Sequence, residues 1–443
     1  MKKIEPKLPK GMRDLEPGDM IIRNRVLTLI KATFEKYGYE PLETPALEYW
    51  EILTGKYGQE AERLVYHLTD HGGRHLGLRY DLTVPLARYI ASHQHLLKPF
   101  KRYQIQPVWR AEKPQKGRYR EFYQCDVDAV GSASMIVDAE LIALTVEIFD
   151  AIGFKNFETR VNNRKILQAM VQAAGIESGR SADVCQSLDK FEKIGWDQVE
   201  SELLQKGYTR PQISVLGELR LFSGDNFTIL SDVEKILGGI PVGDEGIQEL
   251  REILECLAAM DVEQKHIKLR PTMTRGLDYY TGPIFETFLT DRTFSSLGGG
   301  GRYDGLVGIF SRETIPASGT SFGLDRIVAA LHEIGQEQTG STTTEILVVL
   351  FSTELKSEAI SLVSRCRKAG FRSELYYEPV KLRKQFSYAN QKGIPLVLLI
   401  GDVEAEEQAV QLKDMKNGVQ ETVPLQNLEE RLSEKLKRGK ERS

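Results

Sequence analysis

The chain has 443 residues, more than one typical hydrophobic core needs, so two or three domains are expected. Its composition, 41% apolar and 28% charged, is close to the globular average and excludes a fibrous or globally disordered protein. With a formal net charge of −4, the chain shows no basic surplus of the kind that advertises nucleic-acid binding. Any RNA contact therefore has to use local basic patches.

Cysteine usage and hydropathy exclude further classes. The four cysteines are widely separated and form no Cys-x-x-Cys pair, so neither a structural zinc site nor a disulfide framework is expected. The opening Met-Lys-Lys is not followed by the apolar run of a signal peptide. No segment approaches the roughly 20 apolar residues that span a bilayer. We therefore expect a cytoplasmic protein that does not enter a membrane.

The N-terminal region predicts a helix that feeds an extended segment. From Asp19 the apolar residues recur on one helical face, and Gly38 ends the pattern. Residues 39–45 contain two prolines, and the residue before each proline is held out of the helical region. The pair packs either in the core or at a subunit interface.

Residues 102–130 predict a β-hairpin whose second strand begins near Tyr119. Side chains alternate between the faces of a strand, so residues 123, 125, 127 and 129 share a mainly apolar face. The opposite face carries Phe122, Gln124, Asp126 and Asp128. On the first strand Arg102, Gln104, Gln106 and Arg110 share a parity, so a polar floor with cations and anions is expected.

Residues 162–265 are helical, charged and rich in loops, which indicates an insertion. After them, residues 275–286 place an arginine, glycines and paired tyrosines before an alternating apolar strand. Guanidinium, phenol and glycine backbone groups suit an anionic ligand with a ring. A tyrosine-rich structural strand is an equally good interpretation of this segment taken alone.

Two further segments precede the C-terminal region. The four glycines of residues 298–301 permit close backbone approach to a ligand, although a flexible turn is the favoured interpretation of such a run on its own. Residues 322–326 predict the start of a helix with Leu324, Ile327, Val328 and Leu331 facing the core and Gly335 at its end. Arg326 in the first turn opposes the helix dipole, so it is either a surface residue or one held for an anionic or aromatic ligand.

The small, polar residues 336–344 predict a linker, and strands alternate with helices after it. This alternation predicts a small, largely parallel α/β sheet, with a hairpin turn at Asn417-Gly418 and a capping box from Asn427 to Glu430. Tyr376, Tyr377 and Tyr388 are either core residues or stacking surfaces for unpaired RNA bases.

Taken together, these segments resemble the class II aminoacyl-tRNA synthetases, and among them the histidyl-tRNA synthetases. Residues 19–53, 110–128 and 319–326 resemble motifs 1, 2 and 3 of the class. Residues 79–83 resemble the amino-acid loop, and Arg275-Gly-Leu-Asp-Tyr-Tyr280 resembles the peptide peculiar to the histidine enzymes. Five such blocks in the family's order carry far more weight than any one of them.

The resemblance implies an α+β class II catalytic domain, an antiparallel sheet flanked by helices, with a helical insertion and a C-terminal α/β anticodon-binding domain. The expected parts are catalytic residues 1–161, insertion 162–265, catalytic residues 266–335, linker 336–344 and anticodon-binding residues 345–443. The expected reaction is ATP-dependent ligation of L-histidine to tRNA-His through a histidyl-adenylate. The partners implied are ATP, L-histidine, tRNA-His and a second copy in a homodimer, with Mg²⁺ accompanying ATP on ligands that the sequence does not assign.

The family's site residues carry over to matching positions of this chain. For catalysis the resemblance implies Arg110 and Arg275. For ATP it implies Arg110, Glu112, Arg118, Phe122 and Arg326, with Phe122 and Arg326 sandwiching the adenine. For histidine it implies Asp81, Thr83, Gln124, Asp128, Tyr279 and Tyr280, with Asp128 accepting the ring N–H.

One departure and three alternatives stay open at this point. Many bacterial members have Glu-Gly-Thr where this chain has Asp81-Leu-Thr83, a form that looks like the eukaryotic and archaeal one. This leaves open how far Asp81 reaches and how the extra 5′ guanosine of tRNA-His is read. The alternatives are a non-catalytic, histidine-sensing regulatory paralogue of ATP phosphoribosyltransferase, a synthetase for threonine, proline or glycine, and a scaffold. Residues 345–443 and the arginines at positions 110, 275 and 326 argue against the first.

Overall fold

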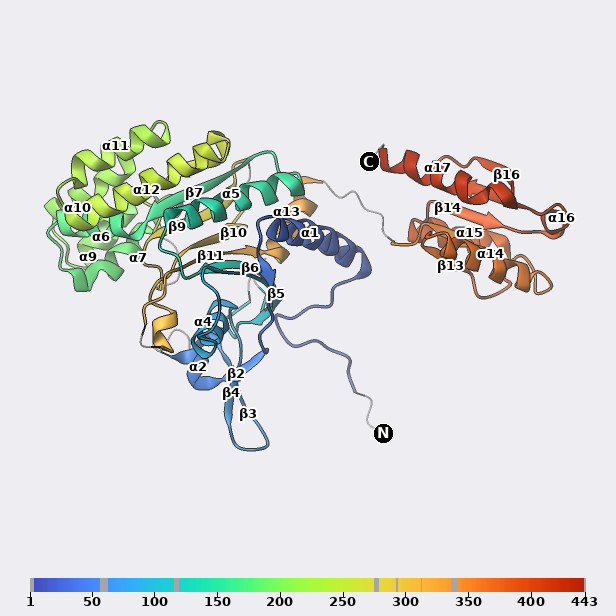
Figure 1. The fold of residues 1–443 in the computed structure, drawn as a ribbon, viewed down its shortest axis with the longest axis horizontal. Helices are drawn as coiled ribbons and strands as arrows, with labels where there is room; N and C mark the ends of the chain where they lie inside the picture. Colours follow the sequence, from blue (N-terminus) through green and yellow to red (C-terminus); the bar gives the residue numbers. More distant parts are fainter. Residues whose placement is uncertain are drawn as a thin grey trace. The chain divides into compact units, whose positions relative to one another are not determined.

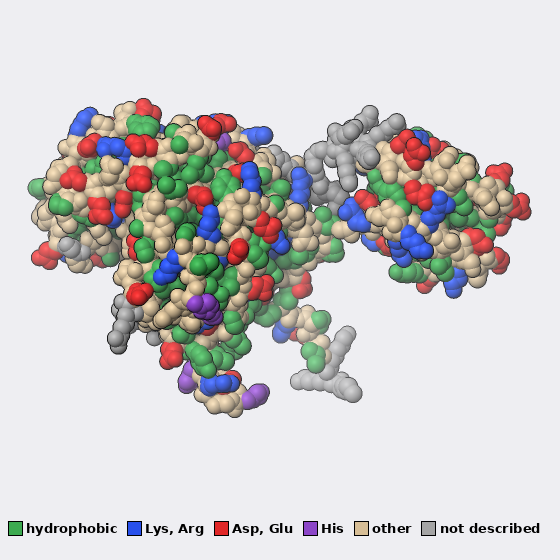
Figure 2. Space-filling view, in the orientation of Figure 1, with side chains coloured by type: hydrophobic (Ala, Val, Ile, Leu, Met, Phe, Trp, Pro, Cys, Tyr) green, Lys and Arg blue, Asp and Glu red, His purple; other side chains and the backbone are tan. Residues whose placement is uncertain are grey.

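The computed structural model describes residues 4–55, 63–114, 119–274, 279–291, 294–311, 313–335 and 342–441. The chain divides into two compact units, one of residues 1–13 and 26–330, the other of residues 14–25 and 331–443. Within these ranges no helix is long and apolar enough to cross a membrane. Figure 2 shows that acidic and basic side chains alternate over the visible face of each unit, as the small net charge predicts.

A mixed sheet organises the first unit (Figure 1). Its described residues form eight strands in the order β1-β5-β6-β11-β10-β9-β7-β8. The strands are β1 (Glu40–Pro41), β5 (Phe100–Trp109), β6 (Glu121–Val130), β7 (Phe157–Asn163), β8 (Ile267–Leu269), β9 (Pro283–Leu289), β10 (Gly298–Arg302) and β11 (Ala317–Gly323). The six strands from β5 to β7 pair antiparallel, and only the edge pairs β1–β5 and β7–β8 are parallel. The predicted antiparallel sheet is therefore observed.

A second, three-stranded sheet lies beside α2, the helix that directly follows its first strand. Within the described residues its order is β2-β4-β3, with β2 (Leu47–Tyr49), β3 (Tyr66–Thr69) and β4 (His75–Leu78). The helices before and around the main sheet are α1 (Pro17–Lys36), α2 (Trp50–Thr54), α4 (Thr83–Ser92), α5 (Met135–Ile152) and α13 (Leu324–Ile334). The predicted helices at residues 19 and 324 are thus present, and Leu324, Ile327, Val328 and Leu331 are buried as expected.

The helical segment predicted between residues 162 and 265 lies between β7 and β8. Its helices are α6 (Arg164–Ala173), α7 (Ser181–Leu188), α8 (Phe191–Ile194), α9 (Trp196–Gln205), α10 (Arg210–Gly217), α11 (Asn226–Leu237) and α12 (Pro241–Ala259). Neighbouring strands of one sheet, β7 and β8, bracket this run of helices. The domain boundaries given above stay predictions.

The β5–β6 hairpin confirms the predicted parity. Its register sets Arg102 opposite Asp128, Gln104 opposite Asp126 and Gln106 opposite Gln124, so polar side chains from both strands share one face. On the other face Cys125 and Val127 are completely buried. There the rings of Phe322 on β11 and Phe149 on α5 lie 6.0 Å apart, which places α5 over the apolar face. The polar face is left for a ligand site.

The glycine run at residues 298–301 is not a flexible turn, because it forms β10 between β9 and β11. The turn interpretation is therefore wrong. A Cβ atom at Gly300 would lie 2.0 Å from the carbonyl oxygen of Gly319, and one at Gly301 would lie 2.5 Å from that of Pro283. Close approach of neighbouring backbones, rather than conformational freedom, explains why this strand lacks side chains.

The second unit contains a five-stranded sheet in the order β13-β12-β14-β15-β16 within the described residues. Its strands are β12 (Ile346–Val348), β13 (Ser373–Leu375), β14 (Leu396–Leu399), β15 (Ala409–Asp414) and β16 (Gln420–Pro424), and its helices are α14 (Lys356–Lys368), α15 (Leu382–Lys392), α16 (Asp402–Glu406) and α17 (Leu428–Glu441). Strands β13, β12 and β14 are parallel, but β15 and β16 add antiparallel. The largely parallel sheet predicted from the alternation is therefore mixed, because the predicted Asn417-Gly418 hairpin joins β15 to β16 in this sheet.

The three tyrosines considered as RNA contacts differ in burial. The rings of Tyr376 and Tyr388 pack edge to face 5.4 Å apart, and the Tyr388 hydroxyl donates to Glu374. Tyr377 is 83% exposed. Tyr376 and Tyr388 are therefore packed residues, whereas Tyr377 presents its ring to solvent.

Replacing Gly300 by alanine should destabilise the first unit by about 3 kcal/mol, the upper end of ordinary overpacking, because the new methyl group meets rigid backbone. Gly305 is a matched control, since a Cβ atom there meets nothing within 4 Å. Gly305→Ala should change stability by less than about 0.5 kcal/mol. Urea unfolding of both variants measures the difference, and equal midpoints would contradict the packing explanation.

Candidate active site

Two adjoining pockets open on the polar face of the main sheet. They share Arg110, Gln124, Tyr280, Gly299 and Ser321. We call the one that also contains Phe122 and Arg326 the larger pocket, and the one that also contains Asp81 and Asp128 the smaller pocket. The shared residues make them two parts of one site.

The described candidate residues all line this site. Glu112, Phe122 and Arg326 line the larger pocket; Asp81, Thr83, Asp128 and Tyr279 line the smaller one; and Arg110, Gln124 and Tyr280 line both. Arg118 and Arg275 lie outside the described residues. Residues from five segments of the chain thus converge, although their individual roles stay predictions.

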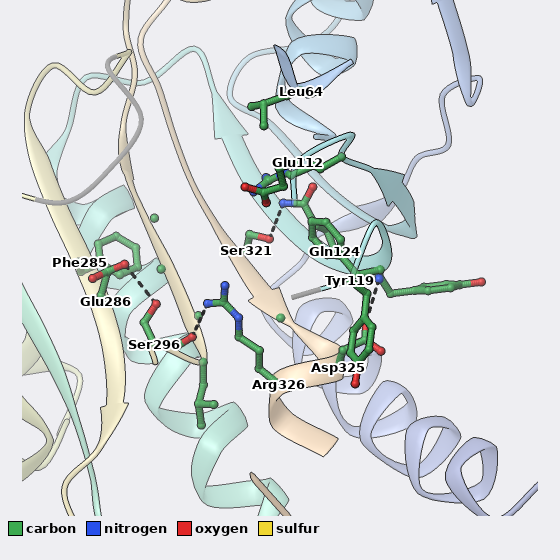
Figure 3. Close-up of a pocket in the computed structure, with 18 of the residues that line it drawn as sticks. Leu64, Glu112, Tyr119, Gln124, Phe285, Glu286, Ser296, Ser321, Asp325 and Arg326 are labelled. Carbon is green, nitrogen blue, oxygen red and sulfur yellow. Dashed lines mark hydrogen bonds between the residues drawn. The ribbon is translucent and has the colours of Figure 1, made fainter. Parts of the chain in front are cut away.

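Cations and aromatic rings define the larger pocket. The Arg110 Nε donates to the Tyr80 carbonyl oxygen over 3.1 Å, and its guanidinium carbon lies 5.1 Å from the centre of the Phe122 ring. The Arg326 Nη1 donates to the Ser296 carbonyl oxygen over 2.8 Å, as Figure 3 shows. Because both guanidinium groups are anchored by backbone carbonyls, they are preorganised to meet an anionic ligand with a flat ring.

An N-terminal residue, Arg13, supports this pocket, and sequence reasoning missed it. The Arg13 guanidinium pairs with Asp325 and lies 3.8 Å from the centre of the Tyr119 ring. Asp325 also accepts a hydrogen bond from the Tyr123 backbone N–H over 3.1 Å. Asp325 therefore ties the first turn of α13, which carries Arg326, to the strand that carries Gln124. No periodicity in the sequence relates residue 13 to residue 325.

The smaller pocket is acidic and deeply buried. Asp81, Asp126 and Asp128 are each at most 3% exposed. The Nη2 of Arg102, itself fully buried, lies 2.8 Å from Asp128 Oδ2, and the Tyr303 hydroxyl donates to Asp128 Oδ1. Burial raises the pKa of Asp81 to about 6 and, with the neighbouring Asp128 carboxylate, that of Asp126 to about 7; burial also raises the pKa of Asp128. The pocket therefore favours a cationic ligand.

Several buried acceptors in this region have no hydrogen-bond partner within the ranges that the structure describes. They are Asp81 Oδ2, Gln124 Oε1, Asp126 Oδ1 and Thr320 Oγ1. Buried polar atoms are nearly always paired in folded proteins, so a cluster of unpaired acceptors indicates a site shaped for a ligand with several donors. An ammonium group and a ring N–H are such donors.

The remaining lining residues were visible in the sequence only in part. Asp126 and Arg102 belong to the predicted polar floor but received no role. Thr320 and Ser321 could have been found from the pairing of β11 with β6, which sets Ser321 opposite Asp126. Tyr303 directly follows the glycine strand. It was missed because the glycine run was interpreted as a turn. Among the described residues, no group of three His, Cys, Asp or Glu side chains is arranged to hold a metal ion.

Two family models match the chain. Residues 11–327 match the model described as histidyl-tRNA synthetase, and residues 345–435 match that described as an anticodon binding domain. A histidine–tRNA ligase of Gloeobacter violaceus is 41% identical over 94% of this chain and 96% of its own, and one of Cytophaga hutchinsonii is 40% identical over 94% and 97%.

Solved structures agree. The crystal structure of histidyl-tRNA synthetase from Nostoc sp. PCC 7120 matches with a TM-score of 0.89 and 32% identity, over 98% of this chain and all of that one. An ATP phosphoribosyltransferase regulatory subunit/histidyl-tRNA synthetase from Bacillus halodurans matches with a TM-score of 0.74 at 24% identity, over 87% and 97%. At that identity the second likeness shows the fold alone.

An antiparallel sheet whose polar face carries a cationic and an acidic pocket, together with a matching anticodon-binding unit, defines a class II aminoacyl-tRNA synthetase. Within that class, the chain belongs to the histidyl-tRNA synthetase family. The predicted fold class, family and enzyme class are therefore confirmed.

Asp126→Asn should stabilise the ligand-free protein at pH 8. The folded-state pKa of Asp126 is about 7, well above the ordinary value near 3.9, so the fold favours the protonated form and loses stability as pH rises from about 4 to about 7, above which the loss is constant. Asparagine cannot ionise and avoids this loss, a gain on the order of a few kcal/mol at pH 8 that is much smaller at pH 5 and vanishes below about pH 4. Thermal unfolding at both pH values measures it, and an equal difference at both would refute the assignment.

Proposed function

We propose that the protein ligates L-histidine to tRNA-His in two ATP-dependent steps through a histidyl-adenylate. The observation that carries this proposal is the junction of the two pockets at Arg110, because one cation borders both an acidic cavity and a cationic one. The reaction has to unite a molecule with a positive end, histidine, and a polyanion, ATP. Each pocket has the charge that its own substrate requires.

In the first step a carboxylate oxygen of histidine attacks the α-phosphorus of ATP, and the bond to the leaving pyrophosphate breaks. The two reactants repel each other, so preplaced cations supply the main catalytic effect. Arg110 lies where the carboxylate and α-phosphate would meet, and its fork can bind both anions. We assign Arg275 to the charge of the transition state and Arg118 to the outer phosphates on the resemblance alone.

Substrate placement follows from the walls of the two pockets. The ammonium group would be held by Asp81 and Thr83 beside Gln124, with the imidazole between Asp128 and Tyr280. Hydrogen bonds link Tyr279 with Thr83 and with Tyr280, which makes the tyrosines one wall. Phe122 and Arg326 would flank the adenine, with Glu112 close to the nucleotide or the tRNA end.

We propose that Mg²⁺ enters with the triphosphate. Magnesium in such sites takes one or two carboxylates together with phosphate oxygens. Two of the carboxylates that line the larger pocket, Glu112 and Glu286, are the side chains that we propose would hold the ion together with the phosphates. The ion would offset phosphate charge beside Arg110.

In the second step a ribose hydroxyl at the end of the tRNA attacks the adenylate and releases AMP. We assign residues 345–443 to the anticodon, since residues 345–435 match an anticodon-binding model. Tyr377, with its exposed ring, is the candidate for stacking on an unpaired base. Because this reaction serves protein synthesis, we propose a cytoplasmic location, which cell fractionation would test.

We further propose a homodimer that covers the apolar face of the three-stranded sheet. The register sets Leu47 opposite Leu78, Tyr49 opposite Leu76, and Leu68 opposite Leu76, so these side chains share one face. Leu47, Tyr49 and Leu68 are 42–49% exposed. Contiguous apolar surface of this kind marks an interaction site. Strand β2 of this sheet lies within residues 19–53, the segment that resembles motif 1, and the resemblance implies that the dimer forms through this motif.

The regulatory alternative has less support. Arg110 and Arg326 line the larger pocket, and the chain carries a match to an anticodon-binding domain. Neither feature is needed by a protein that only senses histidine.

Purified protein should catalyse ATP–pyrophosphate exchange with histidine and with no other amino acid, in the absence of tRNA. Arg110→Ala should reduce the exchange rate by roughly a hundredfold or more, in line with the loss of one preorganised charge partner of the transition state. Arg372→Ala, a change to an exposed arginine of the second unit, should leave the rate unchanged, because no tRNA is present in this assay.

Three results would count against the proposal. Histidine binding without exchange would favour the regulatory alternative. Exchange with another amino acid would mean that the smaller pocket has been assigned to the wrong substrate. Full exchange by Arg110→Ala would remove the central role of the pocket junction.

Leu68→Glu should convert a dimer to monomers in sedimentation velocity, because it places two charges, one from each copy, in the apolar contact. Leu221→Glu is the control, since Leu221 is 66% exposed and lies in the helical segment between β7 and β8. A wild-type protein that sediments as a monomer would contradict the proposed dimer, and an unchanged Leu68→Glu dimer would exclude this face.

A further inference from the structure

We propose that Asp126 is a specificity-determining residue that, together with Asp128, binds the substrate's ring as an imidazolium, with both ring N–H groups donating to carboxylates. This inference rests on the proposed function, because it concerns the histidine of that same site. It adds the protonation state that the site selects and the residue that imposes the choice.

Asp126 is buried in the pocket, but only part of its hydrogen-bonding capacity is used. It sits on β6 opposite Gln104 of β5 and Ser321 of β11, and it is 2% exposed. The Ser321 hydroxyl, which accepts from the Gln124 amide over 3.1 Å, hydrogen bonds with the Asp126 carboxylate. Asp126 lines the smaller pocket, and its Oδ1 has no hydrogen-bond partner in the part of the chain that the structure describes. A buried carboxylate oxygen in that position calls for a donor from the ligand.

Asp128 differs in its partners. The nearby Arg102 guanidinium and the Tyr303 hydroxyl both contact it. The contact with Arg102 is an ion pair without hydrogen-bond alignment, so Asp128 Oδ2 still has acceptor capacity. Among the described residues Arg102 makes its ion pair with Asp128, and none forms at Asp126. One buried cation therefore serves two neighbouring carboxylates.

The donors and acceptors of the ring decide between its two forms. Neutral imidazole has one N–H donor and one bare nitrogen, whereas imidazolium has two donors. Between two carboxylates, neutral imidazole would set its bare nitrogen against an acceptor oxygen. Imidazolium donates a hydrogen bond to an oxygen of each carboxylate. Its positive charge also neutralises Asp126, the carboxylate that does not pair with Arg102. Asp81 is left for the ammonium group.

The surrounding charges agree with this assignment. Facing the pair are Asp81, Arg102 and Arg110, the hydroxyls of Tyr279, Tyr280 and Tyr303, and Glu286 near Tyr280. Burial and the Asp128 carboxylate raise the pKa of Asp126 to about 7, close to the ordinary value near 6.5 of a histidine ring. Near neutral pH either Asp126 or the histidine ring can therefore bring a proton into the complex.

The proton balance predicts how affinity depends on pH. The complex contains one proton shared between the ring and Asp126. Below about pH 6.5 the free ring and Asp126 are both protonated, so one proton has to leave on binding. Above about pH 7 both are deprotonated, so one has to be taken up. Histidine affinity should therefore peak between these values and fall on both sides.

Asp126→Asn should change the shape of the pH dependence of histidine affinity. An asparagine side chain cannot balance the second ring charge, so the variant should bind neutral imidazole, and its affinity should rise with pH through about 6.5 and then level off. Loss of one charge-assisted contact should weaken histidine binding by roughly 10- to 100-fold at pH 6.5, with the KM for ATP unchanged. Asp197→Asn, an exposed position in α9, is the matched control and should change neither quantity.

Nitrogen-15 NMR of ring-labelled histidine bound to the full chain tests the protonation state directly. Two protonated ring nitrogens in the wild type at pH 7.5, and one protonated and one bare nitrogen in Asp126→Asn, would support the proposal. One bare nitrogen in the wild type would overturn it.

A triazole analogue of histidine, whose ring does not protonate near neutral pH, gives a second test by calorimetry. The wild type should prefer histidine over the analogue by at least roughly tenfold, and Asp126→Asn should lose most of that preference. An unchanged preference in the variant would also overturn the proposal. ATP–pyrophosphate exchange by the wild type is measured in parallel. Absence of exchange would count against the proposed function, whereas the protonation state of the bound ring is decided by the binding measurements alone.

Discussion

The buried contact between Arg102 and Asp128 is the interaction on which the site depends. Taking a guanidinium and a carboxylate out of water costs several kcal/mol per ion, and only close contact with further hydrogen bonds offsets it. Arg102 also donates to the Leu82 carbonyl oxygen, and Tyr303 donates to Asp128, so the pair links β5, β6, the start of α4 and the residue after β10. Removing either partner would leave a buried charge inside the main sheet. The pair therefore holds the floor of the smaller pocket in place.

The glycine-rich strands next to this pair follow from the same demand for space. A Cβ atom at Gly319 would lie 2.0 Å from Asp128 Oδ1, so the Asp128 carboxylate fits only because β11 has no side chain there. The strand β10 continues this arrangement towards β9. Glycine in a strand interior loses stability to chain entropy and gives up packing. This chain accepts both costs in the middle of its main sheet, where they make room for the carboxylates and for the ligand.

Sequence reasoning reached the polar face of the hairpin because strand parity is local: once residues 102–130 are a hairpin, Arg102 and Asp128 must share a side. It also brought together all the described candidate residues, since each lies in a short segment with its own recognisable pattern. It failed where long-range packing decides. The glycine strand was taken for a turn because its reason, the approach of Gly319 and Pro283, is invisible along the chain. The same holds for the pairing of Arg13 with Asp325 and for the antiparallel edge of the second sheet.

The charge difference between the two pockets explains how one site could bind two substrates in a fixed relative orientation. In the proposed binding mode, the acidic pocket would hold the positive end of histidine, with the carboxylate pointing back towards Arg110. The cationic pocket would bind the polyanion on the other side of that residue. A different amino acid could enter, but it would leave buried carboxylates such as Asp126 without donors, and a site built on buried polar contacts rejects such ligands by a factor of roughly 10⁴ or more. Discrimination of that size needs no separate editing step. In the proposed binding mode, the unpaired acceptors of the ligand-free protein would therefore be the physical origin of its selectivity, because only a ligand with donors at the right places pairs them.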